Sequence, residues 1–268
     1  MPDPLPAQNV METRAFVERT ASRTVCIVNL RGTVHEREKV FSEDIGTGTA
    51  CVWRKQRLIL TAKHVLEKAH QPDLAFVTRV GTSIDWDETR QKEVATRVSL
   101  PIDRIIRCGW EDLAAIVLGP CDRPNVDFCE LPDKFARNLS GRDAVVVMGY
   151  PVDRTLTVSR TKDQGVLTDL MAVVPTTIMG ETVAKPSRPL SSDYDAQRHF
   201  LIRFDPAEPG LLPFGYSGAG VWCDNRDVAG VWAADPLLAG VETHAYVGLG
   251  LLRAVKAEVV RQFLEESL

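Results

Sequence analysis

Short apolar runs alternate along the chain with charged or glycine-containing segments, which is the pattern of a protein built mainly from strands. A short helix is expected over residues 10–19, behind a proline-rich start, and apolar positions at helical spacing predict a closing helix over 252–264. Strands are expected at 25–30, 48–53, 58–62, 74–80, 93–100, 102–108, 113–118, 143–150, 155–159, 165–174, 199–204, 221–223, 228–233 and 246–251.

The strand pattern is interrupted over residues 119–140, which contain three prolines and no regular period. This interruption predicts a lead-in over 1–23, a first half over 24–118, a connection over 119–140 and a second half over 141–268. A polar segment with three more prolines, 175–198, is expected to be a long surface loop.

Composition places the chain among globular proteins large enough for two packed halves, with 268 residues, 44% hydrophobic and 25% charged. The net charge of −4 comes from interspersed acidic and basic residues, so nucleic acid and anionic membranes are not expected partners. The start has neither the basic nor the apolar region of a secretory signal, and no apolar run reaches membrane-spanning length. We therefore expect a cytoplasmic protein.

Six cysteines are scattered without a Cys-x-x-Cys pair, which disfavours a zinc site and a disulfide framework and predicts buried, reduced thiols. Four histidines also lack the mutual spacing of metal ligands: His35, His70, His199 and His244. No metal and no organic cofactor are expected.

Ser217 is the candidate nucleophile, because it lies between glycines just ahead of an apolar run. Glycines at 215 and 218 allow a tight turn, in which the N–H groups of Gly215 and Ser217 can point together at a developing oxyanion. A serine needs a base to take its proton and a third group to orient that base.

His64, two residues after the run LILTA, and Asp112, directly before an apolar run, are the candidate base and orienting acid. An α/β-hydrolase needs the chain order Ser, acid, His; behind Ser217 only Asp235 and His244 are available, in a short tail without surrounding helices. The order His, Asp, Ser is therefore favoured.

Three local motifs resemble those of the trypsin-like, chymotrypsin-fold serine proteases: TAKH at 61–64, DLAAIVL at 112–118 and GYSGAG at 215–220. Within that family the chain is most similar to the bacterial HtrA-like branch, on GTGTACVW at 46–53, VVMGYP at 146–151 and VAGVW at 228–232. Many HtrA-like proteins carry a PDZ domain, but because the sequence ends soon after the predicted closing helix, no PDZ domain is expected here.

This resemblance implies an all-β fold of two packed six-stranded antiparallel β-barrels with a C-terminal helix. It also implies a serine endopeptidase acting on a protein or peptide through His64, Asp112 and Ser217, with an oxyanion hole at Gly215 and Ser217. The alternative is a catalytically silent pseudoprotease that keeps the fold for binding. Tyr216 stands where digestive proteases carry the aspartate that receives a freed N-terminus, so we expect activity without trimming, or control by a regulatory protein or ligand.

By the same resemblance, the substrate pocket is walled by the residues just before the nucleophile and by the strand that follows it. Leu211 occupies the position of the aspartate that pairs with Arg or Lys in trypsin-type enzymes, so a basic side chain would be buried unpaired. Small or medium apolar residues are expected instead, unless a shifted loop brings in Glu208. The expected pocket residues are Leu211, Leu212, Val231, Trp232 and Ala233.

Overall fold

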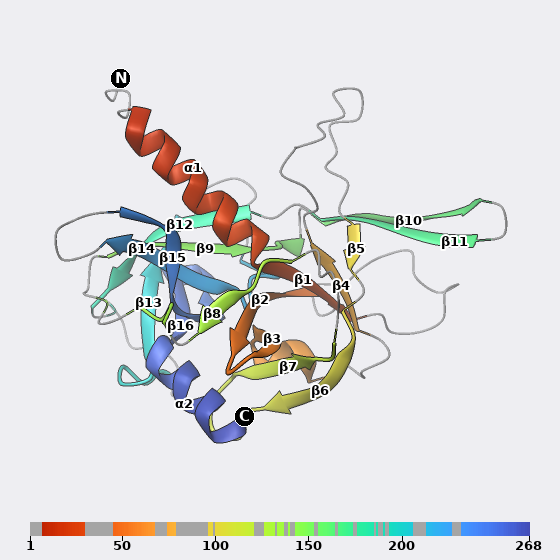
Figure 1. Ribbon diagram of the computed structural model, residues 1–268. Helices are drawn as coiled ribbons and strands as arrows, with labels where there is room; N and C mark the ends of the chain where they lie inside the picture. Colours follow the sequence, from red (N-terminus) through yellow and green to blue (C-terminus); the bar gives the residue numbers. More distant parts are fainter. Residues whose placement is uncertain are drawn as a thin grey trace.

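Two arrays of strands, one from each half of the chain, make up most of the computed structural model (Figure 1). The structure describes residues 7–29, 45–67, 74–78, 96–98, 100–120, 126–131, 133–136, 139, 143–152, 155–163, 166–173, 176–184, 186, 190, 193–205, 213–226 and 232–268.

The first array is an eight-stranded sheet in the order β5-β4-β1-β2-β3-β7-β6, with β8 added beside β2. All pairs are antiparallel except β2 with β8. Its strands are β1 (Thr24–Asn29), β2 (Ile45–Trp53), β3 (Gln56–Thr61), β4 (Leu74–Thr78), β5 (Thr96–Val98), β6 (Ile102–Arg107), β7 (Ala114–Leu118) and β8 (Cys129–Leu131).

β8 lies within the predicted connection between the halves. β1 begins at Thr24 opposite Thr49, so the last part of β2 has no neighbour on that side from β1. β8 pairs there, with Cys129 opposite Cys51. Its first and last residues are buried, which explains why part of an irregular segment forms a strand.

The second array is a closed barrel of six strands in the order β12-β13-β16-β15-β14-β9. Its strands are β9 (Ala144–Gly149), β12 (Thr176–Val183), β13 (His199–Arg203), β14 (Gly220–Arg226), β15 (Trp232–Tyr246) and β16 (Leu251–Lys256). The predicted all-β fold with a C-terminal helix is thus confirmed. The second half forms the predicted six-stranded barrel, whereas the first half forms an eight-stranded sheet.

The polar segment 175–198 is not one long loop, contrary to the sequence prediction, because β12 occupies its first part. Alternate residues of this strand, Thr176 and Ile178, are buried while Met179 is exposed, and β12 pairs with both β9 and β13. The prolines at 175 and 186 flank the strand and do not interrupt it.

The predicted strand and helix at the end of the chain were misplaced. β16 covers 251–256, and the closing helix α2 (Ala257–Ser267) begins only after it. The run LLRAVK has apolar residues on both faces because both are covered, and its Arg253 is buried in an ion pair with Asp193. Such a fully buried strand has no alternating pattern, so its apolar positions resembled helical spacing.

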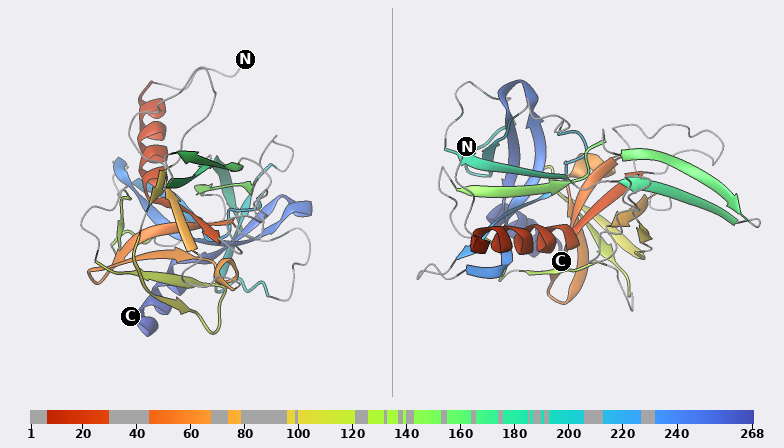
Figure 2. Two further views of the ribbon diagram at one scale, coloured as in Figure 1. Left: turned by 90° about the vertical axis from the view of Figure 1, so that its right-hand side faces the viewer. Right: turned by 90° about the horizontal axis from the view of Figure 1, so that it is seen from above.

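Two further elements extend from the arrays. The hairpin of β10 (Thr155–Asp163) and β11 (Val166–Val173) projects away from the sheet and barrel in Figures 1 and 2. Helix α1 (Ala7–Ser22) is longer than predicted and leads into β1, and the next residue, Arg23, forms an ion pair with Asp235 of β15. Within the part of the chain that the structure describes, no helix is long and apolar enough to span a membrane.

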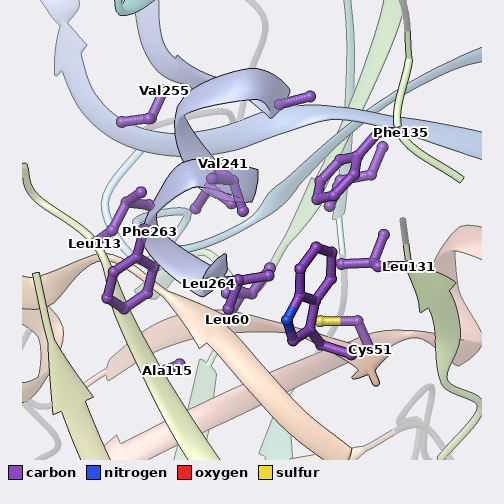
Figure 3. Packing of buried hydrophobic residues seen from close by; sticks show 14 of the residues in the cluster. Cys51, Leu60, Leu113, Ala115, Leu131, Phe135, Val241, Val255, Phe263 and Leu264 are labelled. Atoms are coloured by element: carbon purple, nitrogen blue, oxygen red, sulfur yellow. The ribbon is translucent and has the colours of Figure 1, made fainter. Parts of the chain in front are cut away.

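The core continues from one array into the other beneath α2. Leu60, Leu113 and Ala115 of the sheet half face Val241 and Val255 of the barrel, and α2 covers them with its own apolar residues (Figure 3). Five of the six cysteines are described, and all five are buried free thiols, as expected; Cys121 lies outside the described residues. The continuous core fixes the two halves against each other at the candidate site.

Candidate active site

His64 and Asp112 lie beside the ends of two neighbouring strands, β3 and β7, of the eight-stranded sheet. β3 pairs with β7 so that Thr61 lies opposite Ala114. His64 follows Thr61 in the short 3-10 helix η2 (Lys63–Leu66), and Asp112 closely precedes Ala114. Antiparallel pairing therefore brings together two residues that are 48 positions apart in the sequence.

The His64–Asp112 contact has two points. The imidazole Nδ1 of His64 lies 2.8 Å from Oδ2 of Asp112, and the backbone N–H of His64 donates to Oδ1 at 3.0 Å. Both carboxylate oxygens are thus used on one residue, which orients the ring with Nε2 directed away from the acid. The turn that carries Asp112 is tied further by Lys63, whose ammonium donates to the Cys108 carbonyl at 3.1 Å.

The Asp112 carboxyl is ionised at neutral pH. Its partial burial raises its pKa, but the hydrogen bonds and charge of His64, with help from the Arg253 charge, outweigh burial, so the pKa lies below its ordinary value. An ionised acid on Nδ1 favours the tautomer that leaves Nε2 able to accept a proton.

Ser217 lies in a glycine-containing loop between β13 and β14. Gly215 and Gly218 have positive φ values of 97° and 93°, a conformation that other residues adopt only with strain. At Gly218 an added Cβ would also collide with the carbonyl of Thr47 and the hydroxyl of Thr61. The glycines of the serine motif are therefore required by the backbone and by close approach to the first sheet.

The serine loop docks on the strands that lead to His64. The N–H of Thr47, in β2, donates to the Ser217 carbonyl at 2.9 Å. Gly218 lies against Thr61, three residues before His64. On its other side, the N–H of Gly218 donates to the Glu242 carbonyl at 2.8 Å. The structure therefore brings Ser217 to the junction where His64 and Asp112 lie.

The remaining contact of the predicted trio is not made in this structure. Within the described residues, neither the Ser217 hydroxyl nor Nε2 of His64 takes part in a hydrogen bond. Ser217 is half-buried and His64 is exposed, with 43% of its side chain accessible. The acid–base half of the constellation is therefore assembled, and the nucleophile lies beside it without a bond to the base.

Two peptide groups of the serine loop have fixed directions. The Phe214 carbonyl accepts the N–H of Val152 at 2.9 Å, and the Gly215 carbonyl accepts the Thr47 hydroxyl at 2.6 Å. Because C=O and N–H point oppositely across a trans peptide, the Gly215 N–H points away from Val152. Among the described residues, no acceptor takes the N–H of Gly215 or of Ser217, the two predicted oxyanion donors.

Thr47 is a site residue that the sequence analysis missed. Its side chain is fully buried, and its hydroxyl accepts the Tyr150 N–H at 3.1 Å while donating to Gly215. The only sequence signal was a hydroxyl residue between two glycines, Gly46 and Gly48, in an otherwise apolar run. A buried hydroxyl needs a partner, but nothing in the sequence identifies that partner, 168 positions away.

Glu242 is a second residue near the site that the sequence analysis missed, and it has no sequence signal. It is 1% exposed, and burial together with the negative charge of Asp112 raises the pKa of its carboxyl to about 8, against the opposing effects of Arg253 and the His244 N–H. A protonated carboxyl is therefore buried within electrostatic reach of the ionised Asp112.

The predicted substrate pocket is largely outside the described residues, which leave out Leu211, Leu212 and Val231. Trp232 and Ala233 begin β15, where their backbones pair with β14, but their side chains are not described. The pocket therefore stays a prediction. In the described part of the chain, no three His, Cys, Asp or Glu side chains gather as a metal site would require.

Comparison with known proteins identifies the domain. The model of the trypsin-like peptidase domain matches residues 48–231, whereas a search of curated proteins found no match. The serine endoprotease from Yersinia pestis aligns at a TM-score of 0.52 and 16% identity over 94% of this chain, which spans 65% of the length of that chain. The Rv3671c protease, in its inactive form, aligns at a TM-score of 0.51 and 16% identity over 99% of this chain and 98% of its own.

At 16% identity the two structures show a shared fold alone. This fold is the one expected from the resemblance of the sequence motifs to bacterial serine proteases. The domain match is more informative, because it covers more than half of the 268 residues and contains His64, Asp112 and Ser217. On this evidence the chain belongs to the family of trypsin-like peptidases.

Proposed function

We propose that the protein is a serine endopeptidase in which Ser217, His64 and Asp112 form the catalytic triad. The observation that supports this most strongly is the two-point contact between His64 and the Asp112 carboxylate, made beside the docked loop of Ser217. An ionised acid on Nδ1 is what a histidine needs in order to act as a general base through Nε2.

In the proposed reaction, Nε2 of His64 takes the proton of the Ser217 hydroxyl as the oxygen attacks the scissile carbonyl. The N–H groups of Gly215 and Ser217 hold the resulting oxyanion, each worth about 3 to 4 kcal/mol in comparable sites. His64 then gives its proton to the leaving amine, and an acyl group remains on Ser217. Water, deprotonated by His64, hydrolyses that ester and restores the enzyme.

The specificity that we propose is cleavage after small or medium apolar residues. The argument comes from the sequence: Leu211 stands where a trypsin-type enzyme carries its aspartate, and bulky Trp232 narrows the pocket. A buried substrate cation without a partner costs several kcal/mol, and a misplaced methylene about 1 to 3 kcal/mol. A peptide-library cleavage profile tests this, and dominant cleavage after Arg or Lys would point to Glu208 in the pocket.

The second candidate is a pseudoprotease that keeps the fold for binding. One observation favours it, namely that Ser217 and His64 make no hydrogen bond among the described contacts. Such bonds are often long or misaligned before substrate binds, so this geometry is compatible with both functions. The two differ in whether the protein turns over peptide bonds.

Ser217→Ala separates the two candidates. The endopeptidase predicts that this variant folds like the native protein, since one hydroxyl contributes little to core packing, but loses peptide hydrolysis. Turnover of a quenched fluorescent peptide library, with a thermal melt of each protein, provides the measurement. Native turnover that survives in Ser217→Ala would assign the activity to another site or to a contaminant.

A further inference from the structure

We propose that Glu111 is a positioning residue, held by His199 and Arg198 of the barrel half, which fixes the turn carrying Asp112. The inference rests on the proposed function, since it assigns a task in orienting the acid of the triad. It concerns contacts that cross from one half of the molecule to the other, 88 positions apart in the sequence.

The Glu111 carboxylate connects the acid to the barrel. Its Oε1 accepts the backbone N–H of Asp112 at 3.0 Å, and its Oε2 lies 3.1 Å from Nε2 of His199. Nδ1 of His199 accepts the N–H of Asp195 at 2.9 Å, so in a neutral ring the proton is on Nε2. The His199 ring therefore donates to Glu111, which in turn holds the peptide N–H of the acid.

Arg198 holds the same turn one residue earlier. Its guanidinium donates to the Trp110 carbonyl at 3.0 Å and lies 3.4 Å from Oε2 of Glu111, and its Nε pairs with Asp195 at 3.0 Å. Arg198 and His199 of the barrel half thus contact Trp110 and Glu111 of the sheet half. The backbone before Asp112 is fixed at successive residues.

The barrel side of this contact is itself rigid. His199 begins β13, opposite Val255 of β16, and the N–H of Lys256 donates to the Arg198 carbonyl at 2.9 Å. The residue is also fixed locally, because the backbone N–H of His199 donates to the Asp195 carbonyl at 2.7 Å while the Asp195 N–H donates to the ring. The position of Glu111 is therefore set by the same barrel that carries Ser217.

Burial makes these contacts costly to lose. The side chains of His199 and Glu111 are 1% and 6% exposed. Burial raises the pKa of the Glu111 carboxyl, but the hydrogen bonds from His199 and the Asp112 N–H and the charge of Arg198 lower it by more, so this pKa lies below its ordinary value. Without the His199 donor, a buried charge would lose a partner and Glu111 would move toward solvent.

The consequence for the triad is geometric. Small displacements of a positioned catalytic group reduce the rate of the chemical step, by about a hundredfold for 1 Å, more than they reduce substrate binding. Loss of this contact is therefore expected to lower kcat with little change in KM, and to weaken the hydrogen bond from His64 Nδ1–H to Asp112. A contact that only stabilised the fold would do neither.

The test compares His199→Leu with His199→Gln, whose amide N–H lies near the position of Nε2–H. We expect His199→Leu to lower kcat about ten- to a hundredfold with KM within about twofold, and His199→Gln to restore most of it. Ile202→Val, on the same strand and in the barrel core, is the matched control for lost stability and should retain native kcat. Equal kcat in His199→Leu and the native protein would overturn the inference.

A second measurement does not depend on turnover. A hydrogen-bonded Nδ1–H of His64 is expected as a low-field proton resonance, assigned by its absence in His64→Ala. In His199→Leu it should shift or broaden, while His199→Gln and Ile202→Val keep the native signal. An unchanged resonance in His199→Leu would refute the positioning role even if the native protein hydrolyses peptides, and a shifted one would support it even if hydrolysis is absent and the proposed function fails.

Discussion

The turn that carries Asp112 and the loop that carries Ser217 are each held by the opposite half of the molecule, but through different groups. The Asp112 turn is fixed by polar side chains, the ionised Glu111 and the imidazole of His199. The Ser217 loop is fixed by backbone groups and the single hydroxyl of Thr47. The side-chain contacts of the Asp112 turn depend on protonation, and another side chain with a donor at the same position can replace His199. The Ser217 loop depends on close packing, because an added Cβ at Gly215 or Gly218 would collide with neighbouring backbone.

The largest expected effect is on the side that depends on shape. Gly218→Ala adds a methyl group at a φ of 93°, against Thr47 and Thr61. Strain and overpacking together should lower the free energy of unfolding by about 3 kcal/mol or more. Urea denaturation measures it, with Gly248→Ala as control because an added Cβ there meets no atom within 4 Å. Equal urea midpoints for Gly218→Ala and Gly248→Ala would contradict the close docking of the Ser217 loop.

The next effect concerns Glu242, which interacts with both regions. Its backbone carbonyl accepts the Gly218 N–H, and the charge of Asp112 contributes to raising the pKa of its carboxyl. Because its folded-state pKa is raised to about 8, the folded protein binds the proton more tightly than the unfolded chain, whose value is about 4.3. Stability attributable to this group therefore falls as pH rises from about 4.3 to about 8.

Glu242→Gln should therefore stabilise the protein at pH 8, on the order of 2 kcal/mol, and less at pH 5. Asp112 has the opposite sign, since its lowered pKa gives a contribution that is present above about 3.9 and is lost as pH falls through the folded-state pKa. Denaturation of the native protein and Glu242→Gln across this pH range checks the prediction. A gain that does not depend on pH would show that the buried proton is not its cause.

An effect of similar size is expected at Thr47. Thr47→Val keeps the shape but removes the hydroxyl that pairs with Gly215 and Tyr150, so a buried donor and acceptor lose their partner at about 1 to 3 kcal/mol. Peptide hydrolysis should fall with it, because the direction of the Gly215 peptide is no longer fixed. Thr47→Ser is the matched control and should keep most of both properties. Full activity in Thr47→Val would mean that the backbone alone fixes the serine loop.

The candidate triad could be predicted because each of its residues lies in a short local motif. The residues around His64, Asp112 and Ser217 carry their own signals, such as an apolar strand beside a polar residue or glycines that permit positive φ. The contact of His64 with Asp112 was predicted and is present.

The groups that hold the site could not be predicted, because their partners are far apart in the sequence. His199 appeared as a histidine without ligand spacing, and nothing near Glu111 indicated that the two would meet. Most of β15 was missed and β16 was misplaced for a related reason. β15 runs through 15 residues with bulges, and Arg253 in β16 is buried because Asp193 pairs with it. Such pairings depend on the folded barrel and leave no periodic signal.

The most direct test of the proposed endopeptidase is reaction of the folded native protein with a fluorophosphonate probe, followed by peptide mapping. A serine activated by His64 beside open oxyanion donors predicts one covalent adduct, on Ser217, that is absent from Ser217→Ala and strongly reduced in His64→Ala. No adduct on the native protein, or an adduct that persists when Ser217 is replaced, would contradict the triad.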